Sequence, residues 1–509
     1  MSSSSKTFIG LAVYSWLIAA MGILLLGLLV YAGLNLLQPY LWYDEAVQFW
    51  IGKGLNPDSP SFSTPGNFAA VFENNRYYNL DPGGFSLLLH AWSAISNQVI
   101  WLRLLPFLFF IVSVAVAMYS AWLLTGRKHW AFLAGFMPFL ISNWIQLSVE
   151  LRAYSMEGLG SMLCIAGLLH LQQALSMKRL LAWSLVFCFF MSSRYTEVIM
   201  VAITSVYVLY LIYTHTANIK QAMVYSLVYA LPLCLTVAGI YVWVMRIQNA
   251  DMNALYYLPY LSRKLSLLWN PNVFWFNVFF LLNSVFFLVS FKVTALKPLR
   301  PLFFLASASN TVLILLSVAG VHPWGPFSYR CISLLIMQVT CSGLALIAWL
   351  NSHWSQWQFG ITVVLLFLLI GFSASKHPKA IKRFKDKQNA YYAFKQHKIP
   401  ANVKIYADYF QAPYMKYLFE YGDGKNWATP KYPAQFYLAK CTRHGFTQGN
   451  QSPYFDYLKT QPVMNDLLEY DWLLTPQLFQ KGQHDAWELL PGSSSVWVKK
   501  LNKENDDAE

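Results

Sequence analysis

The sequence predicts a mainly α-helical membrane protein, a polytopic bundle of about eleven transmembrane helices followed by a small C-terminal α/β domain. Hydrophobic residues make up 56% of the 509 residues and charged residues only 12%, against about 25% charged in a typical soluble domain. Many apolar stretches approach the ~20 residues that cross a bilayer. After residue 375 the pattern becomes polar and globular. We therefore expect a transmembrane module at 1–375 and a soluble domain at 376–509.

Hydropathy places the starts of the membrane segments within a few residues. The predicted spans begin near Leu11, Trp101, Trp130, Tyr154, Leu180, Val198, Met223, Asn272, Leu302, Cys331 and Trp357. The first apolar run, 11–37, is too long for the core of a signal peptide and lacks a small-residue cleavage site, so we interpret it as an uncleaved helix.

Charge distribution predicts the orientation of these spans. With the N-terminus inside, the inner loops carry Arg127, Lys128, Lys178, Arg179, Lys220, Lys292, Lys297 and Arg300, as the positive-inside rule expects. The nine acids before residue 375 then lie outside or at the outer ends of helices: Asp44, Glu45, Asp58, Glu73, Asp81, Glu150, Glu157, Glu197 and Asp251. An odd number of spans also places the tail outside.

The tail alternates between strand-like and helix-like segments. Residues 403–407, 470–474 and 495–499 have the short apolar or β-branched pattern of strands, and 412–421 has that of a helix. This order predicts a small α/β domain on the outer face. It carries no catalytic motif, and from its placement alone we expect it to act as a cap that selects an acceptor.

An acidic pair, Asp44 and Glu45, opens an unusually long outer loop at 38–98. Aromatic residues surround the pair, including Trp42, Tyr43 and Trp50. Trp and Tyr collect at the membrane–water boundary, where an ionised acid is costly and usually has a function. Two solvated acids at a loop start would be the simpler interpretation, but the motifs described below favour a functional pair.

The net charge of +14 does not indicate nucleic acid, because the charge is spread along the chain. Anionic membrane lipids or lipid phosphates fit it better, and ordinary inner loops explain part of it. None of the six cysteines has metal-ligand spacing, and no His, Asp or Glu spacing indicates a metal site. We therefore expect membrane lipids as partners, no nucleic acid, and no required cofactor.

Several motifs share one order and one outward topology. They are Asp44-Glu45, the stretch 81–92 that begins Asp-Pro-Gly-Gly, Trp101-Leu-Arg103, Glu150-Leu-Arg-Ala-Tyr154, and Tyr329-Arg330. Together they resemble the GT-C glycosyltransferases, in the branch of protein O-mannosyltransferases, aminoarabinose transferases and galacturonosyl transferases of lipopolysaccharide core. The resemblance covers most of residues 1–370. It departs from the family at Gly83-Gly84, where the family has a second proline and an apolar residue, and at Tyr329-Arg330, which reverses the family order.

The resemblance implies transfer of a sugar from a polyprenyl phosphate to an acceptor hydroxyl, with inversion, at the extracytoplasmic face. The acceptor would be an envelope glycan such as lipopolysaccharide, a lipid or a protein. The implied location is a bacterial inner or plasma membrane, with a cytoplasmic N-terminus and a periplasmic C-terminal domain. A divalent cation stays open, because some GT-C enzymes use one and others do not.

Within this chemistry Asp44 is the expected general base, since a hydroxyl nucleophile must lose its proton as the bond forms. Glu45 would point ~100° away on a helix and support Asp44 or contact the acceptor. The cations expected at the donor phosphate are Arg103, Arg152, Arg330, Arg263 and Lys264. The expected substrate-binding residues are Asp81, Glu150, Tyr154, His322 and Tyr329.

Two purely structural interpretations compete with these functional roles. Each cation could simply be an interfacial side chain that reaches toward water. Arg152 could form a structural ion pair with Glu150 or Glu157.

The alternative function is a carrier or flippase for lipid-linked sugars. A carrier should show ionisable residues near the midplane or inverted repeats. The charges of this chain gather at the outer ends instead, which favours the enzyme. A channel or scaffold leaves the acidic pair unexplained.

Overall fold

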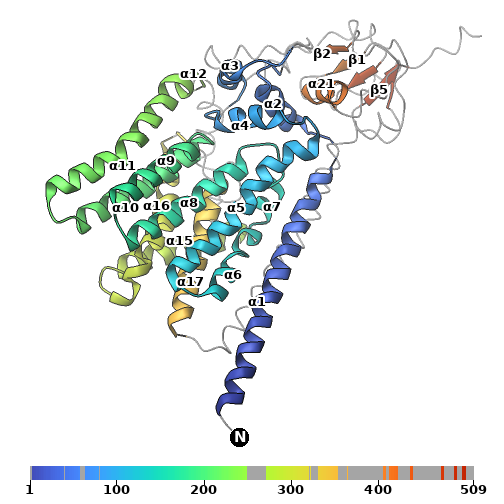
Figure 1. Ribbon diagram of the computed structural model, residues 1–509. Helices are drawn as coiled ribbons and strands as arrows, with labels where there is room; N and C mark the ends of the chain where they lie inside the picture. The colour runs from blue at the N-terminus through green and yellow to red at the C-terminus, as the bar shows by residue number, and fades with distance from the viewer. Residues whose placement is uncertain are drawn as a thin grey trace, which may run out of the picture. The chain divides into compact units, whose positions relative to one another are not determined.

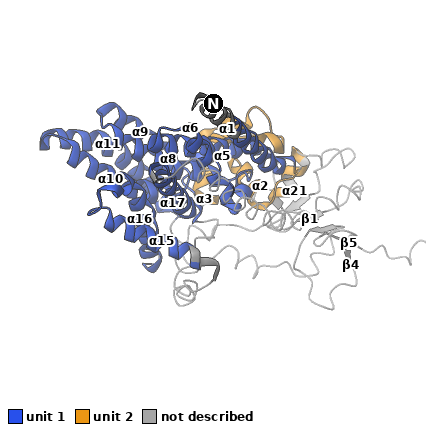
Figure 2. Ribbon diagram, turned by 90° about the horizontal axis from the view of Figure 1, so that it is seen from below, with its two compact units in different colours: residues 1–37, 81–85, 103–377 blue, residues 38–80, 86–102, 378–509 orange. Residues whose placement is uncertain are grey.

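The computed structural model describes residues 3–38, 40–57, 64–79, 81–248, 271–319, 321–322, 331–353, 364, 405–407, 412–421, 436–438, 472–474, 487–489 and 496–499. The chain divides into two compact units, coloured in Figure 2. We call Met1–Leu37, Asp81–Phe85 and Arg103–His377 the bundle unit, and Gln38–Leu80, Ser86–Leu102 and Pro378–Glu509 the loop–tail unit.

All the regular elements described in the bundle unit are helices (Figure 1). Its elements are α1 (Ser3–Gly33), η1 (Leu34–Leu37), most of α5 (Val99–Thr125), α6 (Lys128–Ala134), η2 (Met137–Leu140), α7 (Ser142–Leu147), α8 (Tyr154–Gln173), α9 (Met177–Met191), α10 (Tyr195–His215), α11 (Ile219–Ile240), η3 (Tyr241–Met245), α12 (Arg246–Gln248), α15 (Pro271–Val289), η4 (Thr294–Leu299), α16 (Arg300–Val318) and α17 (Ile332–His353).

Six helical segments among the described residues are long and apolar enough to cross a bilayer: Ile18–Leu37, Val99–Thr125, Tyr195–His215, Ile219–Gln248, Thr294–Val318 and Ile332–Ser352. The protein is therefore a multi-pass helical membrane protein. The count of eleven spans stays a prediction, because most of the segment expected from Trp357 lies outside the described residues.

One predicted span differs from the structure. The stretch from Trp130 is not a single helix but three short pieces, α6, η2 and α7. Pro138 lies in the first turn of η2. It has no backbone N–H to donate and its ring clashes with the preceding turn, which kinks or breaks an α-helix. Here the helix breaks, whereas α5 and α11 continue through Pro106 and Pro232. The apolar composition of the stretch hides this interruption from a hydropathy average.

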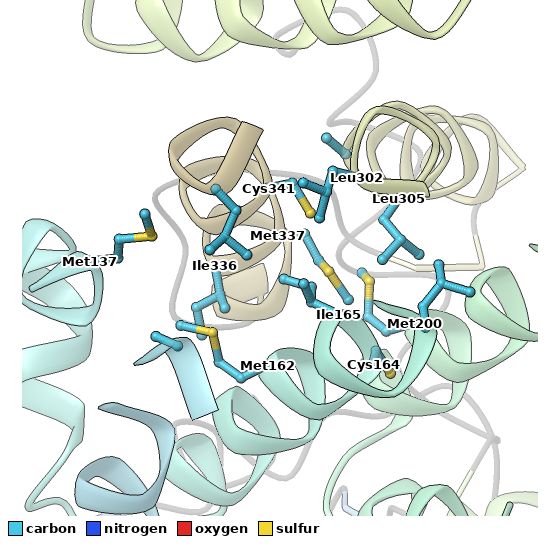
Figure 3. Close-up of a cluster of buried hydrophobic side chains, with 14 of the residues drawn as sticks. Met137, Met162, Cys164, Ile165, Met200, Leu302, Leu305, Ile336, Met337 and Cys341 are labelled. Carbon is cyan, nitrogen blue, oxygen red and sulfur yellow. The ribbon is translucent and has the colours of Figure 1, made fainter. Parts of the chain in front are cut away.

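Helix α8 lies in the core of the bundle unit, where it packs against α9, α10 and α17. Figure 3 shows buried side chains gathered there, among them Ile165 of α8, Met200 of α10, Leu305 of α16 and Met337 of α17. A glycine on α8 also allows α7 to approach closely. A Cβ added at Gly158 would stand 2.5 Å from the ring of buried Trp144.

The loop–tail unit combines short helices with a small mixed sheet. Its helices are α2 (Tyr43–Gly52), α3 (Phe68–Tyr78), most of α4 (Gly84–Ser93) and α21 (Ala412–Glu420). Its strands are β1 (Ile405–Ala407), β2 (Phe436–Leu438), β3 (Trp472–Leu474), β4 (Trp487–Leu489) and β5 (Val496–Lys499), in the order β2-β1-β3-β5-β4. Strand β1 is parallel to β2 and β3, and β5 is antiparallel to β3 and β4.

Strands β1, β3 and β5 lie within the three stretches predicted as strands, and α21 lies within the predicted helix. The α/β domain at 376–509 stays a prediction as a whole, because most of that range lies outside the described residues.

The close approach at Gly158 predicts the effect of one added methyl group. We expect Gly158→Ala to destabilise the protein by about 1–3 kcal/mol, because the ring of Trp144 is buried and packs edge-to-face on Phe110 at 5.4 Å. The control is Gly27→Ala in α1, where nothing lies within 4 Å of the new Cβ; it should be neutral or stabilise by up to about 1 kcal/mol. Thermal unfolding in detergent measures both, and equal stabilities would contradict the packing.

Candidate functional site

A buried guanidinium joins two carboxylates in the bundle unit. Arg194 immediately precedes α10, and its Nε lies 3.1 Å from Asp81 Oδ1 while its Nη1 lies 3.1 Å from Glu157 Oε2. The Glu157 side chain is fully buried and the other two are nearly so. The guanidinium Cζ also lies 4.6 Å from the ring centroid of Tyr154, a cation–π contact. We call these four residues the Arg194 cluster.

Burial disfavours the charged form of Arg194, but the neighbouring Glu157 and Asp81 carboxylates outweigh it and raise its pKa above the usual value. The side chain therefore stays a cation. With two carboxylates against one guanidinium, its positive charge is already compensated within the protein.

Three further side chains hold the Arg194 cluster in place. Ser333, at the start of α17, donates from its Oγ to Glu157 Oε1 at 2.5 Å. Gln248, at the end of α12, donates to the backbone oxygen of Asp81 at 3.3 Å and accepts from the Tyr195 hydroxyl at 2.5 Å. The starts of α8, α10 and α17 and the end of α12 thus meet at one end of the bundle unit.

Two glycines allow the turn after Asp81 to approach this end. The backbone N–H of Gly84 donates to Ser192 O at 2.9 Å, and a Cβ on Gly84 would overlap the Ser192 side chain. Gly83 has a φ of 105°, a conformation that L side chains rarely adopt. The pair Gly83-Gly84 thus has a local physical reason, since the positive φ and the backbone contact with Ser192 need glycine.

The structure brings two expected substrate-binding residues, Asp81 and Tyr154, together around Arg194. Glu150 and Arg152 lie just before α8, where the N–H of Arg152 donates to Glu150 O at 2.6 Å. The Arg152 guanidinium Cζ lies 5.9 Å from the Tyr154 ring centroid.

Two other expected residues lie in the bundle unit but are not among the four residues of the Arg194 cluster. His322 Nε2 lies 3.4 Å from Thr196 Oγ1, beside the start of α10. Arg103 is 1% exposed within α5. The expected residues Arg263, Lys264, Tyr329 and Arg330 lie outside the described residues.

Sequence reasoning missed the central residue of the cluster, Arg194. It stands between two predicted spans, on the side where the acids gather, and Glu197 follows one turn later. This position was the only feature of the sequence that could have indicated Arg194 as a site residue. The ion pair considered between Arg152 and Glu157 has a different cation in the structure, because Glu157 contacts Arg194.

The two ends of the bundle unit carry different charges. All its described acids lie at the cluster end: Asp81, Glu150, Glu157 and Glu197. At the opposite end, Gln172 and Gln173 of α8 donate to Pro298 O and Leu123 O, which joins the ends of α8, η4 and α5 there. The charged residues described at that end are all basic: Arg127, Lys128, Lys178, Arg179, Lys220, Lys292, Lys297 and Arg300. The described acids of the bundle unit therefore lie at the end that holds the Arg194 cluster, and these eight basic residues lie at the other.

The acidic pair lies in the loop–tail unit, in the first turn of α2. Glu45 is fully buried, and its Oε2 accepts a hydrogen bond from the backbone N–H of Trp42 at 3.2 Å. This contact closes the N-terminus of the helix as in a capping box. Asp44 is half-buried in the same turn, where the helix dipole favours negative charge. The two neighbouring acids therefore have different surroundings.

Buried polar contacts fix α2 to its neighbours in the loop–tail unit. Gln48 donates to Ser86 Oγ at 2.7 Å, and Asn79 donates to Gln48 Oε1 at 3.2 Å. Lys53, at the end of α2, donates from its Nζ to Ser93 O at 3.0 Å. Such a satisfied network holds a helix in one orientation.

Comparison with known proteins gives no further guide to this site. No protein-family model matches the chain, and no curated protein matches it. Within the described residues there is no group of three or more His, Cys, Asp or Glu side chains that could hold a metal ion.

The Arg194 cluster predicts a large loss of folding stability when its cation is removed. We expect Arg194→Gln to destabilise the protein by about 3–5 kcal/mol, because two buried carboxylates lose their partner. The matched control is Arg76→Gln, which removes an exposed i,i+3 pair with Glu73; it should change stability by no more than about 1 kcal/mol. Denaturation in detergent gives both values. A small effect of Arg194→Gln would mean that the ion pairs of Arg194 with Asp81 and Glu157 contribute little to stability.

The buried Lys53 predicts a pH dependence. Burial lowers its pKa, so the unfolded chain holds this proton more tightly than the folded one. Between the lowered pKa and about 10.4, the unfolded value, the contribution of Lys53 to stability should increase as the pH rises. The increase should be absent in Lys53→Met and present in Lys220→Met, whose lysine is exposed. Unfolding temperatures from about pH 7 to 10.5 test this, and parallel profiles for wild type and Lys53→Met would contradict it.

Proposed function

We propose that this protein is an integral membrane glycosyltransferase that moves a sugar from a polyprenyl-phosphate donor to an envelope glycan, a lipid or a protein at the extracytoplasmic face. The observation that supports this most is the charge separation of the bundle unit. Its described acids and the Arg194 cluster lie at one end, and the described charges at the other end are all basic. A reaction on a lipid phosphate at a membrane surface needs charged groups gathered at one end of the helices.

The proposed topology follows from the positive-inside rule. The basic end faces the cytoplasm, so the Arg194 cluster and the first loop face outward. We propose about eleven spans, a cytoplasmic N-terminus and an extracytoplasmic α/β domain at 376–509. The membrane is a bacterial inner or plasma membrane.

The proposed chemistry is a single inverting displacement. Asp44 takes the proton of the acceptor hydroxyl as its oxygen bonds to the anomeric carbon. The bond from that carbon to the phosphate oxygen breaks, and the lipid phosphate leaves with the electron pair. The half-buried position of Asp44 in the first turn of α2 supports this assignment, whereas Glu45 supports the helix through its cap.

Cations stabilise the charge that grows on the leaving phosphate, and arginine offers a planar two-pronged contact. The proposed donor-phosphate residues are Arg103, Arg152, Arg263, Lys264 and Arg330. Arg194 is not among them, because Asp81 and Glu157 already compensate its charge. It organises the site instead.

The proposed substrate contacts are Asp81, Glu150, Tyr154, His322 and Tyr329. In support, Asp81 and Tyr154 both contact Arg194, and Glu150 lies in the segment just before Tyr154, at the start of α8. No cofactor is required in this scheme. Adding or chelating Mg²⁺ and Mn²⁺ in the transfer assay tests whether a divalent ion contributes.

A carrier for lipid-linked sugars is the alternative function. It should place ionisable groups near the middle of the membrane. Of the described acids in the bundle unit, Glu157 and Glu197 lie within long helices, each in the first turn of its helix, α8 and α10. Ser161 Oγ donates to Glu197 at 2.9 Å. Both positions are near a helix end, which favours the enzyme.

The test is sugar transfer in membranes with a panel of labelled polyprenyl-phosphate sugars. We expect Asp44→Asn to lower transfer by about 10²–10⁴-fold, the range of a lost general base. Glu45→Gln is the matched neutralisation, and it should keep most of the activity because an amide oxygen can still accept from Trp42.

Two outcomes would contradict the proposal. If Asp44→Asn transfers sugar at the wild-type rate with an active donor, Asp44 is not the base. If no donor is turned over while labelled lipid crosses the bilayer, the protein is a carrier.

A further inference from the structure

The tail contributes a helix to the surroundings of the acidic pair. Within the loop–tail unit, α21 packs against α2, although more than 350 residues separate them in sequence. The indole N–H of Trp50, on α2, donates to Pro413 O at 2.8 Å. Trp50 and its neighbour Phe49 are both 0% exposed. The contact is therefore a closed interface rather than a surface touch.

Aromatic rings fill this interface. Phe49 packs edge-to-face on Tyr417 at 4.9 Å and on Tyr421 at 5.4 Å between ring centroids. Aromatic pairs of this geometry contribute beyond the area that they bury. Tyr417 is 1% exposed, so its ring is enclosed.

Polar groups at the edge of the rings fix the register of α21. The Tyr417 hydroxyl donates to Asn97 O at 2.8 Å, in the segment after α4. Lys53 Nζ lies 5.9 Å from the ring centroid of Tyr421 while it donates to Ser93 O. Helix α21 is thus joined both to α2 and to the segment after α4.

A short helix depends on such packing. Helix α2 has 10 residues, and isolated helices of that length are marginal in water. A helix of this length is about 15 Å long and moves as a rigid rod. Holding its second half at Phe49, Trp50 and Lys53 therefore sets the direction of its first turn, which carries Asp44 and Glu45.

We infer that α21 positions α2, so that the tail is a working part of the acidic-pair site and not only a module that selects an acceptor. The catalytic consequence rests on the proposed function, because it requires Asp44 to act as base. The positioning itself does not, since it can be measured without any substrate.

The test is a series at Tyr417 in the full-length protein. Tyr417→Phe removes only the hydrogen bond to Asn97, and Tyr417→Ala also removes the ring from Phe49. The matched controls are Tyr77→Phe and Tyr77→Ala on α3, where the ring is 37% exposed. Hydrogen exchange of the amides of residues 43–52 reports on α2, and exchange of α8 reports on the bundle unit as a reference.

We expect exchange in α2 to rise about fivefold in Tyr417→Phe, the effect of one buried hydrogen bond. In Tyr417→Ala it should rise about 10²-fold or more, as for loss of a buried aromatic side chain. Exchange in α8 and in both Tyr77 variants should stay at the wild-type level. With an active donor, kcat of Tyr417→Ala should fall at least about tenfold while the donor KM changes little, since a misplaced base slows chemistry more than binding.

Each failure identifies a different error. Unchanged exchange of α2 across the series would show that α21 does not hold it, and the inference would be wrong. Faster exchange with wild-type kcat would overturn the catalytic role of the positioning. If exchange of α2 is faster in the variants but the wild-type protein transfers no sugar from any donor, the proposed function is wrong. The positioning of α2 by α21 still holds in that case.

Discussion

The cost of burying the Arg194 guanidinium is the constraint on which the cluster end of the bundle unit depends. A charge removed from water costs several kcal/mol unless it is paired and hydrogen-bonded. Arg194 is paired with carboxylates 113 and 37 positions away, Asp81 and Glu157. The turn at Asp81 and the starts of α8 and α10 must therefore converge. The glycine at position 84 follows from this convergence, because the chain leaves Asp81 in backbone contact with Ser192.

The membrane helices could be predicted from sequence because their signal is local. The spans expected near Trp101 and Cys331 begin at Val99 and Ile332 in the structure. An average over many apolar residues locates such a helix well, but it overlooks a single residue that interrupts one. Pro138 was visible in the sequence, yet its neighbours were apolar enough to suggest a continuous span. The length of a hydrophobic run predicts membrane affinity better than it predicts helix continuity.

The candidate site could be predicted only in part, because pairing between charges depends on how helices pack. Asp81 and Tyr154 were expected at the site and lie in the cluster. Arg194 was not, since several arginines occur at the same end and nothing local distinguishes the one that reaches both carboxylates. The cap formed by Glu45 was equally hidden. It depends on the helix starting at Tyr43, and sequence patterns locate helix starts least well.

The contrast between Asp44 and Glu45 follows from what protonation would do to each. Glu45 accepts from the Trp42 N–H at the start of α2, so a proton on its carboxylate would weaken the bond that closes the helix. A general base gains a proton in every cycle, and a group with that structural task is poorly suited to it. Protonation of Asp44 would cost α2 its favourable interaction with the helix dipole, about 0.3–1 kcal/mol. The two adjacent acids can thus have different roles: Glu45 caps the helix, and Asp44 can gain and lose a proton.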